Sequence, residues 1–337
     1  MLHRRLFLFV PFLALASLAL WVSCAEPQPA TESSTQPSAQ TNPVEQIAPG
    51  VWFREGEIQT MGHCNNVIIE MQDYLIVIDA NFPSGAELAL AAAKEVSSKP
   101  VRYVFDTHHH GDHAYGNPVW TKAGATTLAY VGVAEEMKRY EPAGWQNSAK
   151  TRQDVAALNL STAEPPMQTF DESPFVLEDE TRRVEFHFFG WAHTRGDGFA
   201  YLPNERILAS GDAVVNGAYN FTGHGNTGNW PNVLQKLKST LNVERVLPGH
   251  GRPGGIELVD GQMLFFEELN AAVQTAFEQK KDISEVVTVE NNRGASTTIQ
   301  LSGAVQNWVG QNFPEQVRVR WAELAEGKPH GEILGGL

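Results

Sequence analysis

Short apolar runs alternate with segments of helical periodicity from residue 44 to residue 251 of the chain. Each run is rich in aliphatic and β-branched residues and is bounded by turn residues, a pattern typical of strands. Gln72 and Asp73 divide one long run and are expected to form the turn of a hairpin. The runs that predict strands are residues 50–55, 66–80, 101–106, 175–179, 182–190, 198–203, 206–212 and 244–250.

Helical patterns follow each of the two groups of strands. Residues 84–98 predict a helix, in which Ser84 and Glu87 have the spacing of a capping box. Further helices are expected within 132–158 and at 230–241. Because helices close each strand-rich half, the pattern predicts an α/β fold with two sheets packed face to face and helices outside.

The two ends of the chain differ from this central domain, which covers residues 44–255. Residues 256–337 carry helical patterns throughout and are expected to form a helical C-terminal extension. Residues 24–43 are rich in Pro, Ser, Thr and Gln. They predict a disordered tether, because so little apolar surface does not offset the entropy lost on ordering.

The N-terminal segment predicts export. Two arginines precede an apolar run, residues 6–22, which is short for a membrane span and ends in small residues. Residues 1–23 are therefore expected to be a signal peptide, and the protein to be periplasmic or otherwise extracytoplasmic. Two processing routes are open: Cys24 becomes the lipid-modified first residue of a lipoprotein, or Ser23 and Ala25 serve an ordinary signal peptidase. The tether that follows favours the lipoprotein.

Charge and cysteine content narrow the classes of function. The formal net charge is −14, with 25 Lys and Arg against 39 Asp and Glu. Such a chain repels nucleic-acid phosphates, so nucleic-acid binding is not expected. The two cysteines are Cys24 and Cys64. If Cys24 is lipidated or cleaved away, Cys64 has no partner for an internal disulfide, and stability has to come from a packed core.

Histidine and aspartate side chains gather directly after the predicted strands, most densely in FDTHHHGDHAYGN, residues 105–117. Loops at strand ends can aim side chains into one cleft, and imidazole and carboxylate groups are natural zinc ligands. His108 and His110 alone fit a solvated loop equally well, but the whole set predicts a metal centre. The candidate ligands are His108, His110, Asp112, His113, His193, Asp212 and His250.

These residues lie in four motifs that together resemble the metallo-β-lactamase superfamily. The motifs are His-x-His-x-Asp-His, His-Thr-x-Gly-Asp, Ser-Gly-Asp and Pro-Gly-His-Gly, in this order, and the likeness covers about residues 44–251. It implies a four-layer αβ/βα sandwich and two divalent metal ions, zinc before iron or manganese. It also gives Asp79, at the end of the run YLIVIDA, the role of a structural residue beside the metals.

The resemblance assigns a place to every candidate ligand. His108, His110 and His193 would hold the first metal, Asp112, His113 and His250 the second, and Asp212 would bridge both. Two cations lower the pKa of a shared water molecule, which can then attack a carbonyl or phosphoryl centre. Asp112 is also the expected catalytic residue, because it would orient this water.

Other residues have two interpretations each. His63 and His224 lie in loops and are either substrate contacts or plain loop residues. His109, between two ligands, is expected to point away from the metals. Cys64 is expected to be a small, partly buried thiol rather than a nucleophile. The aromatic residues of 219–230 either wall the cleft or pack in the core.

The residue at the bridging position points to a branch of the superfamily. Asp212 stands where broad-spectrum β-lactamases of this superfamily have Cys or Ser, and so resembles the glyoxalase II and lactonase branches. The expected function is an exported dinuclear zinc hydrolase that cleaves an ester, lactone, thioester or amide bond of a small molecule. Three alternatives are open: β-lactamase activity proper, a mononuclear-iron protein resembling persulfide dioxygenase or a redox relay, and a metal-binding lipoprotein without turnover. The membrane is expected as a partner only through the lipid anchor.

Overall fold

The computed structural model describes residues 43–333 of the chain. The expected signal peptide (1–23), Cys24, and all but the last residue of the expected tether (24–43) lie outside this range. Among the helices within it, none is both long enough and apolar enough to cross a membrane.

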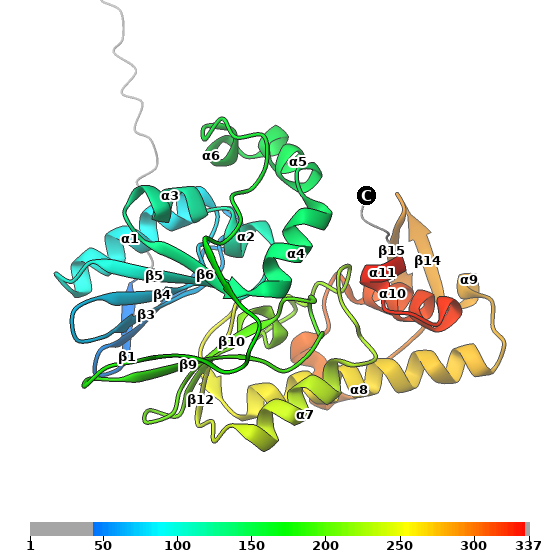
Figure 1. Cartoon of the computed structure of the whole chain (residues 1–337). Helices are drawn as coiled ribbons and strands as arrows, with labels where there is room; N and C mark the ends of the chain where they lie inside the picture. The colour runs from blue at the N-terminus through cyan, green and yellow to red at the C-terminus, as the bar shows by residue number, and fades with distance from the viewer. Residues whose placement is uncertain (1–42, 334–337) are drawn as a thin grey trace, which may run out of the picture. The chain divides into compact units, whose positions relative to one another are not determined.

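Seven strands form the first sheet, which the N-terminal half of the described chain builds (Figure 1). Neighbouring strands are antiparallel from β1 to β4 and parallel from β4 to β7. The hairpin expected at Gln72–Asp73 is confirmed, since it joins β3 to β4. In order across the sheet, the strands are β1 (Val44–Ala48), β2 (Val51–Arg54), β3 (Asn66–Glu70), β4 (Leu75–Ile78), β5 (Val101–Asp106), β6 (Thr126–Tyr130) and β7 (Gln168–Phe170).

Six strands form the second sheet. Neighbours are antiparallel except β11 and β12, which are parallel because helix α7 (Trp230–Thr240) lies between them in the chain. In order across the sheet, the strands are β13 (Gly254–Gly255), β12 (Arg245–Leu247), β11 (Ile207–Ala209), β10 (Gly198–Leu202), β9 (Arg183–Phe188) and β8 (Phe175–Glu178).

The two sheets pack face to face, as the sequence predicts. Phe105 of β5 and Phe186 of β9 meet in the core between them, with ring centroids 4.5 Å apart. Helices α1 (Pro83–Val96) and α3 (Asn117–Lys122) cover the outer face of the first sheet. Helices α7 and α8 (Glu257–Glu278) cover that of the second (Figure 1). This four-layer αβ/βα order confirms the predicted fold class.

The start of α1 differs from the sequence prediction. The helix begins at Pro83, after the extended residue Phe82, and no side chain caps it. Ser84 therefore lies inside the first turn, and its hydroxyl donates to the Asp154 carboxylate (2.6 Å) instead of forming a capping box with Glu87. The capping-box prediction is wrong because a proline, which is suited to the first helical position, sets the helix start.

Short helices occupy the connections of the sandwich. The helical pattern expected within 132–158 is confirmed and is divided into three helices, α4, α5 and α6. The connecting helices are α2 (Gly111–Ala114), α4 (Val131–Tyr140), α5 (Ala143–Thr151), α6 (Gln153–Ala156) and the 3₁₀ helix η1 (Gly211–Ala213).

The C-terminal extension is mixed rather than wholly helical. The expectation of helix throughout is wrong for β14 and β15, which pair as an antiparallel hairpin. The β-branched residues of Val287–Glu290 favour a strand, and Asn291 and Asn292, with φ of 49° and 62°, form the turn. After α8, the elements are α9 (Ile283–Val286), β14 (Val287–Glu290), β15 (Arg293–Thr297), η2 (Gly303–Trp308), α10 (Phe313–Glu326) and α11 (His330–Ile333).

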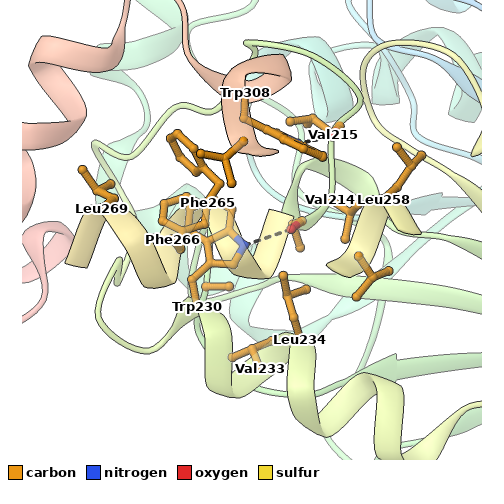
Figure 2. Packing of buried hydrophobic residues seen from close by; sticks show 14 of the residues in the cluster. Val214, Val215, Trp230, Val233, Leu234, Leu258, Phe265, Phe266, Leu269 and Trp308 are labelled. Carbon is orange, nitrogen blue, oxygen red and sulfur yellow. Dashed lines mark hydrogen bonds between the residues drawn. The ribbon is translucent and has the colours of Figure 1, made fainter. Parts of the chain in front are cut away.

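The extension shares a hydrophobic core with the helix layer of the second sheet (Figure 2). Trp230 of α7 stacks on Phe266 of α8, with ring centroids 4.0 Å apart, and its Nε1 donates to the carbonyl of Ala213 (2.9 Å). Trp308 of η2 belongs to the same cluster and donates from Nε1 to the carbonyl of Val215 (2.9 Å). Both carbonyls belong to the segment that follows β11, so α7 and the extension together support a loop that carries a candidate ligand.

Candidate metal centre

Asp79, at the end of β4, fixes the loop that follows β5. Its backbone has φ 66°, in the left-handed region that few residues other than glycine adopt. Its Oδ1 accepts hydrogen bonds from the backbone N and Oγ1 of Thr107 (both 2.8 Å), and its Oδ2 lies 2.8 Å from Nδ1 of His113. Asp79 therefore holds the loop from behind and turns Nε2 of His113 to the opposite side.

Three histidine rings from two loops converge on one point. Nδ1 of His110 lies 3.1 Å from Nε2 of His108 and 3.0 Å from Nε2 of His193. His193 is fixed in turn, because its backbone N donates to the Asp197 carboxylate (2.7 Å) and its Nδ1 lies 2.9 Å from the carbonyl of Phe221. We call His108, His110 and His193 the first ligand group.

Asp112, His113 and His250 form a second ligand group beside the first. Oδ2 of Asp112 lies 3.0 Å from Nε2 of His250 and 3.4 Å from Nε2 of His113. Asp212 reaches both groups: its carboxylate oxygens lie 3.4 Å from Nε2 of His113 and of His250. One of them also lies 3.8 Å from Nε2 of His193. Asp212 thus lies between the two groups.

The two carboxylates and His193 are in the protonation states that metal ligation needs. Burial alone would raise the pKa of Asp112 and Asp212, but the neighbouring His113 and His250 outweigh it and hold both pKa values well below their usual range. Burial lowers the pKa of His193 to about 4. At neutral pH the carboxylates are therefore charged and His193 is neutral, as a cation requires of its ligands.

The pKa values of the other candidate ligand histidines depend on which charged groups surround each ring. Burial, and then the surrounding imidazoles, hold the pKa of His108 and His110 well below the usual range. Burial would also lower the pKa of His250, but Asp212 and Asp112 outweigh it and raise this pKa to about 9. A cation held by His250 would take the place of its proton, so binding there releases a proton.

The residues present fit a dinuclear metal site. Nε2 of His113 and Oδ1 of Asp212 are buried and have no hydrogen-bond partner. Leaving a polar atom buried and unsatisfied costs about 1–3 kcal/mol, and a cation between the two would satisfy both. The donors are imidazole nitrogens and carboxylate oxygens, the kinds that zinc takes in catalytic sites.

A cleft of about 460 Å³ opens over both ligand groups. Its lining residues are His110, Asp112, Asp212 and His250 from the ligand set, and Ile58, Ala218, Tyr219, Phe221, His224 and Asn312 around them. The aromatic segment 219–230 is thus divided, since Trp230 packs in the core instead. Apolar and aromatic walls with a few polar groups suit an apolar small molecule.

The structure separates the two histidines that were candidate substrate contacts. His224 lines the cleft. His63 does not: it is 1% exposed, and its Nε2 lies 2.8 Å from Oγ of Ser84. His109 is also buried, and its Nε2 faces His224 at 3.0 Å rather than either ligand group. Cys64 is a free thiol with no exposed surface, more deeply buried than the sequence suggests.

Sequence reasoning missed four residues of the site, of which Ala218 lines the cleft six positions after Asp212. Ile58 and Asn312 line the cleft from segments far from every motif. Tyr140 of α4 stacks on His224, with ring centroids 3.8 Å apart. The sequence carries no signal for Ile58 or Asn312, since neither belongs to a run or spacing that indicates chemistry.

The fold and the two ligand groups together define an α/β sandwich with a candidate metal centre at one edge. The sequence model of the metallo-β-lactamase superfamily matches residues 60–250 of the chain. The protein therefore belongs to the metallo-β-lactamase superfamily, a superfamily of metal-dependent hydrolases.

Solved structures of metallo-β-lactamases share this fold. The enzyme from Pontibacter korlensis has a TM-score of 0.55 at 20% identity, covering 67% of this chain and 98% of its own. FIM-1 from Pseudomonas aeruginosa, in its mono-zinc form, has a TM-score of 0.54 at 19% identity, covering 67% and 95%. The enzyme from Hirschia baltica has a TM-score of 0.53 at 20% identity, covering 67% and 98%. Likeness at these identities shows a common fold.

Proposed function

We propose that this protein is an exported dinuclear metal hydrolase that cleaves an ester, lactone, thioester or amide bond of an apolar small molecule. The observation that carries the proposal is the place of Asp212, within 3.4 Å of His113 and His250 and 3.8 Å of His193. A carboxylate that reaches both ligand groups is what two cations sharing one ligand require. Membership of a superfamily of metal-dependent hydrolases supports it.

Zinc is the proposed metal at both positions. The first ligand group would hold one ion and the second ligand group the other, with Asp212 contacting both. Imidazole and carboxylate donors favour zinc but also accept iron and manganese. The mono-zinc form of FIM-1 shows that a protein of this fold holds zinc.

The chemistry follows from the side chains that face the cleft. Bound there, divalent cations would supply a water molecule of lowered pKa and a polarised scissile carbonyl. Asp112 would orient this water by accepting a hydrogen bond from it, because its side chain is 23% exposed and its lowered pKa keeps the carboxylate charged. Tyr219 and Phe221 would hold the apolar part of the substrate and exclude bulk water. The Asn312 amide, at the rim, would donate a hydrogen bond to a polar group.

Initial rates on a panel of substrates, together with metal analysis, test the proposal. The chain without residues 1–23 is loaded with zinc and assayed with an aryl ester, a lactone, a thioester, a chromogenic cephalosporin and an aryl phosphodiester. We expect two zinc ions per chain and a clear preference for one bond class. The matched variant Asp112→Asn keeps the shape of the side chain, and we expect it to lose roughly 100-fold or more in rate.

Three other results would each favour one of the alternative functions. One iron per chain with oxygen uptake on a persulfide would favour redox chemistry. Two zinc ions per chain with no turnover by the wild type or by Asp112→Asn would favour a metal-binding protein without catalysis. A cephalosporin hydrolysed faster than every other substrate would favour β-lactamase activity proper.

A further inference from the structure

The outer side of His110 meets two histidines that belong to neither ligand group. While Nδ1 of His110 points to His108 and His193, its Nε2 lies 2.9 Å from Nδ1 of His224. Nε2 of His109 lies 3.0 Å from the same atom of His224. We call His109, His110 and His224 the outer histidine group.

The contact with His224 affects which ring nitrogen of His110 carries the proton. A neutral imidazole that binds a cation through Nδ1 keeps its proton on Nε2, and this N–H needs an acceptor. Nδ1 of His224 lies at hydrogen-bond distance from it. We propose that His224 is a positioning residue: by accepting the bond from His110, it holds the His110 ring with Nδ1 free for the first metal. This inference rests on the proposed dinuclear centre.

Ring stacking fixes the orientation of His224. Tyr140 stacks on His224 with centroids 3.8 Å apart and an interplanar angle of 15°. It also stacks on His109, at 5.2 Å and 11°. Because His109 is only 2% exposed, the three rings form a packed stack in which His224 has little freedom to turn. Nδ1 of His224 therefore stays directed at Nε2 of His110 (2.9 Å), and its single lone pair is shared with Nε2 of His109 (3.0 Å).

The C-terminal extension holds the His224 loop from the other side. Nδ1 of His330 in α11 lies 2.8 Å from the carbonyl of Gly223, and the backbone N of Gly331 donates to the carbonyl of Gly225 (3.3 Å). A Cβ added at Gly331 would come within 2.7 Å of the His224 carbonyl, so α11 packs directly on this loop. Through His224 the extension thus shapes the first ligand group, although it contains none of the candidate ligands.

The same three nitrogens are also close enough to hold a cation of their own. His110 would then bind two cations, one through each ring nitrogen, and would have to lose its remaining proton. The distances of 2.9 and 3.0 Å to Nδ1 of His224 are ordinary hydrogen-bond lengths. They favour a proton at this place, and metal stoichiometry distinguishes the two cases.

Zinc affinity in two variants of His224 tests the proposal. His224→Phe keeps a ring that can stack on Tyr140 but has no acceptor, whereas His224→Asn places an amide oxygen near the position of Nδ1. His187→Phe, at a buried histidine that pairs with Glu185 on β9, is the matched control. Affinity and stoichiometry are measured by competition with a chromophoric chelator, and the Co²⁺ absorption spectrum reports the ligand geometry.

We expect His224→Phe to weaken one of two zinc-binding steps roughly 10- to 100-fold and to change the Co²⁺ spectrum. His224→Asn should recover most of the affinity, and His187→Phe should match the wild type. Wild-type affinity in His224→Phe would overturn the inference alone, as would three zinc ions per wild-type chain that fall to two in His224→Phe. A wild-type chain that binds no zinc would overturn the proposed function as well.

Discussion

The carboxylate of Asp79 does not line the cleft. It contacts the loop after β5, which supplies residues to both ligand groups. It lies 2.8 Å from Nδ1 of His113 and accepts a hydrogen bond from that nitrogen, so a cation would replace the other proton at Nε2, which faces Asp212. It also accepts two bonds from Thr107, the residue before His108. One buried side chain therefore sets both the tautomer of one ligand and the path of the loop that carries another.

Asp79→Asn should weaken zinc binding while the fold is retained. An amide N–H opposite Nδ1 of His113 would favour the tautomer with its proton on Nε2, which blocks ligation. We expect a loss of roughly 10- to 100-fold in affinity, measured by chelator competition. Asp106→Asn is the matched control: Asp106 is also buried just before the ligand loop, but its carboxylate accepts from Nδ2 of Asn117 (2.8 Å), a bond that an amide oxygen can accept as well. Equal losses in the two variants would contradict this role of Asp79.

The positions of the candidate ligands could be predicted because each follows an apolar run that ends a strand. Strand ends on one side of a sandwich meet, so the sequence order of His108, Asp212 and His250 is enough to place them in one region. The residues behind them could not be predicted. His110 and His224 are 114 positions apart, and no local pattern indicates which distant loop lies against a given ring.

The ring of Trp308 packs directly against helix α8 at Gly261. A Cβ added at Gly261 would lie 1.9 Å from Cη2 of Trp308, so only glycine allows η2 to lie this close to the helix. Trp308 has no simple way to move aside, because it is buried and its Nε1 donates to the carbonyl of Val215. The hydrogen bond from Trp308 to Val215 joins the extension to the loop after β11.

Gly261→Ala should destabilise the protein even though alanine favours helices. The gain in helix propensity is about 1 kcal/mol, but the forced shift of Trp308 adds overpacking that typically costs about 1–3 kcal/mol. We expect a net loss in the free energy of unfolding, measured by urea titration of the metal-free protein. Gly303→Ala is the matched control, since a Cβ there meets nothing within 4 Å. A Gly261→Ala protein as stable as the control would show that Trp308 adapts freely.

The elements of the sandwich could be predicted because strands and helices leave periods of different length in the sequence. The exceptions have local causes. Pro83 moved the start of α1 ahead of Ser84, and the Asn291–Asn292 turn produced a hairpin in an extension that otherwise reads as helix. In both places a turn or helix-start residue outweighed the wider pattern.

The described residues of the whole molecule contain separate hydrophobic clusters. One lies between the two sheets, a second joins the second sheet to α7 and the extension, and a third joins the first sheet to α1. The site lies at one edge, where the loops of both sheets meet. We propose that this body is exported and anchored by lipid at Cys24, which lies outside the described residues.

Cell fractionation of a bacterial host that expresses the full chain tests the anchor. We expect the wild type in the membrane fraction, with a lipid-modified Cys24 found by mass spectrometry, and Cys24→Ala in the soluble or unprocessed fraction. A soluble wild type that begins near Ala25 would support an ordinary signal peptidase instead. A wild type that keeps residues 1–23 in the cytoplasm would contradict export.

The packing of the extension on Trp230 has an evolutionary consequence. A chain that stopped near residue 255 would leave the faces of Trp230 and Val215 without Phe266 and Trp308, and so would expose a large apolar surface. Loss of the extension by a single truncation would therefore yield an insoluble intermediate. A sandwich of this kind without the extension would need polar residues on this face to stay soluble, so the surface of the sandwich and the presence of the extension constrain each other.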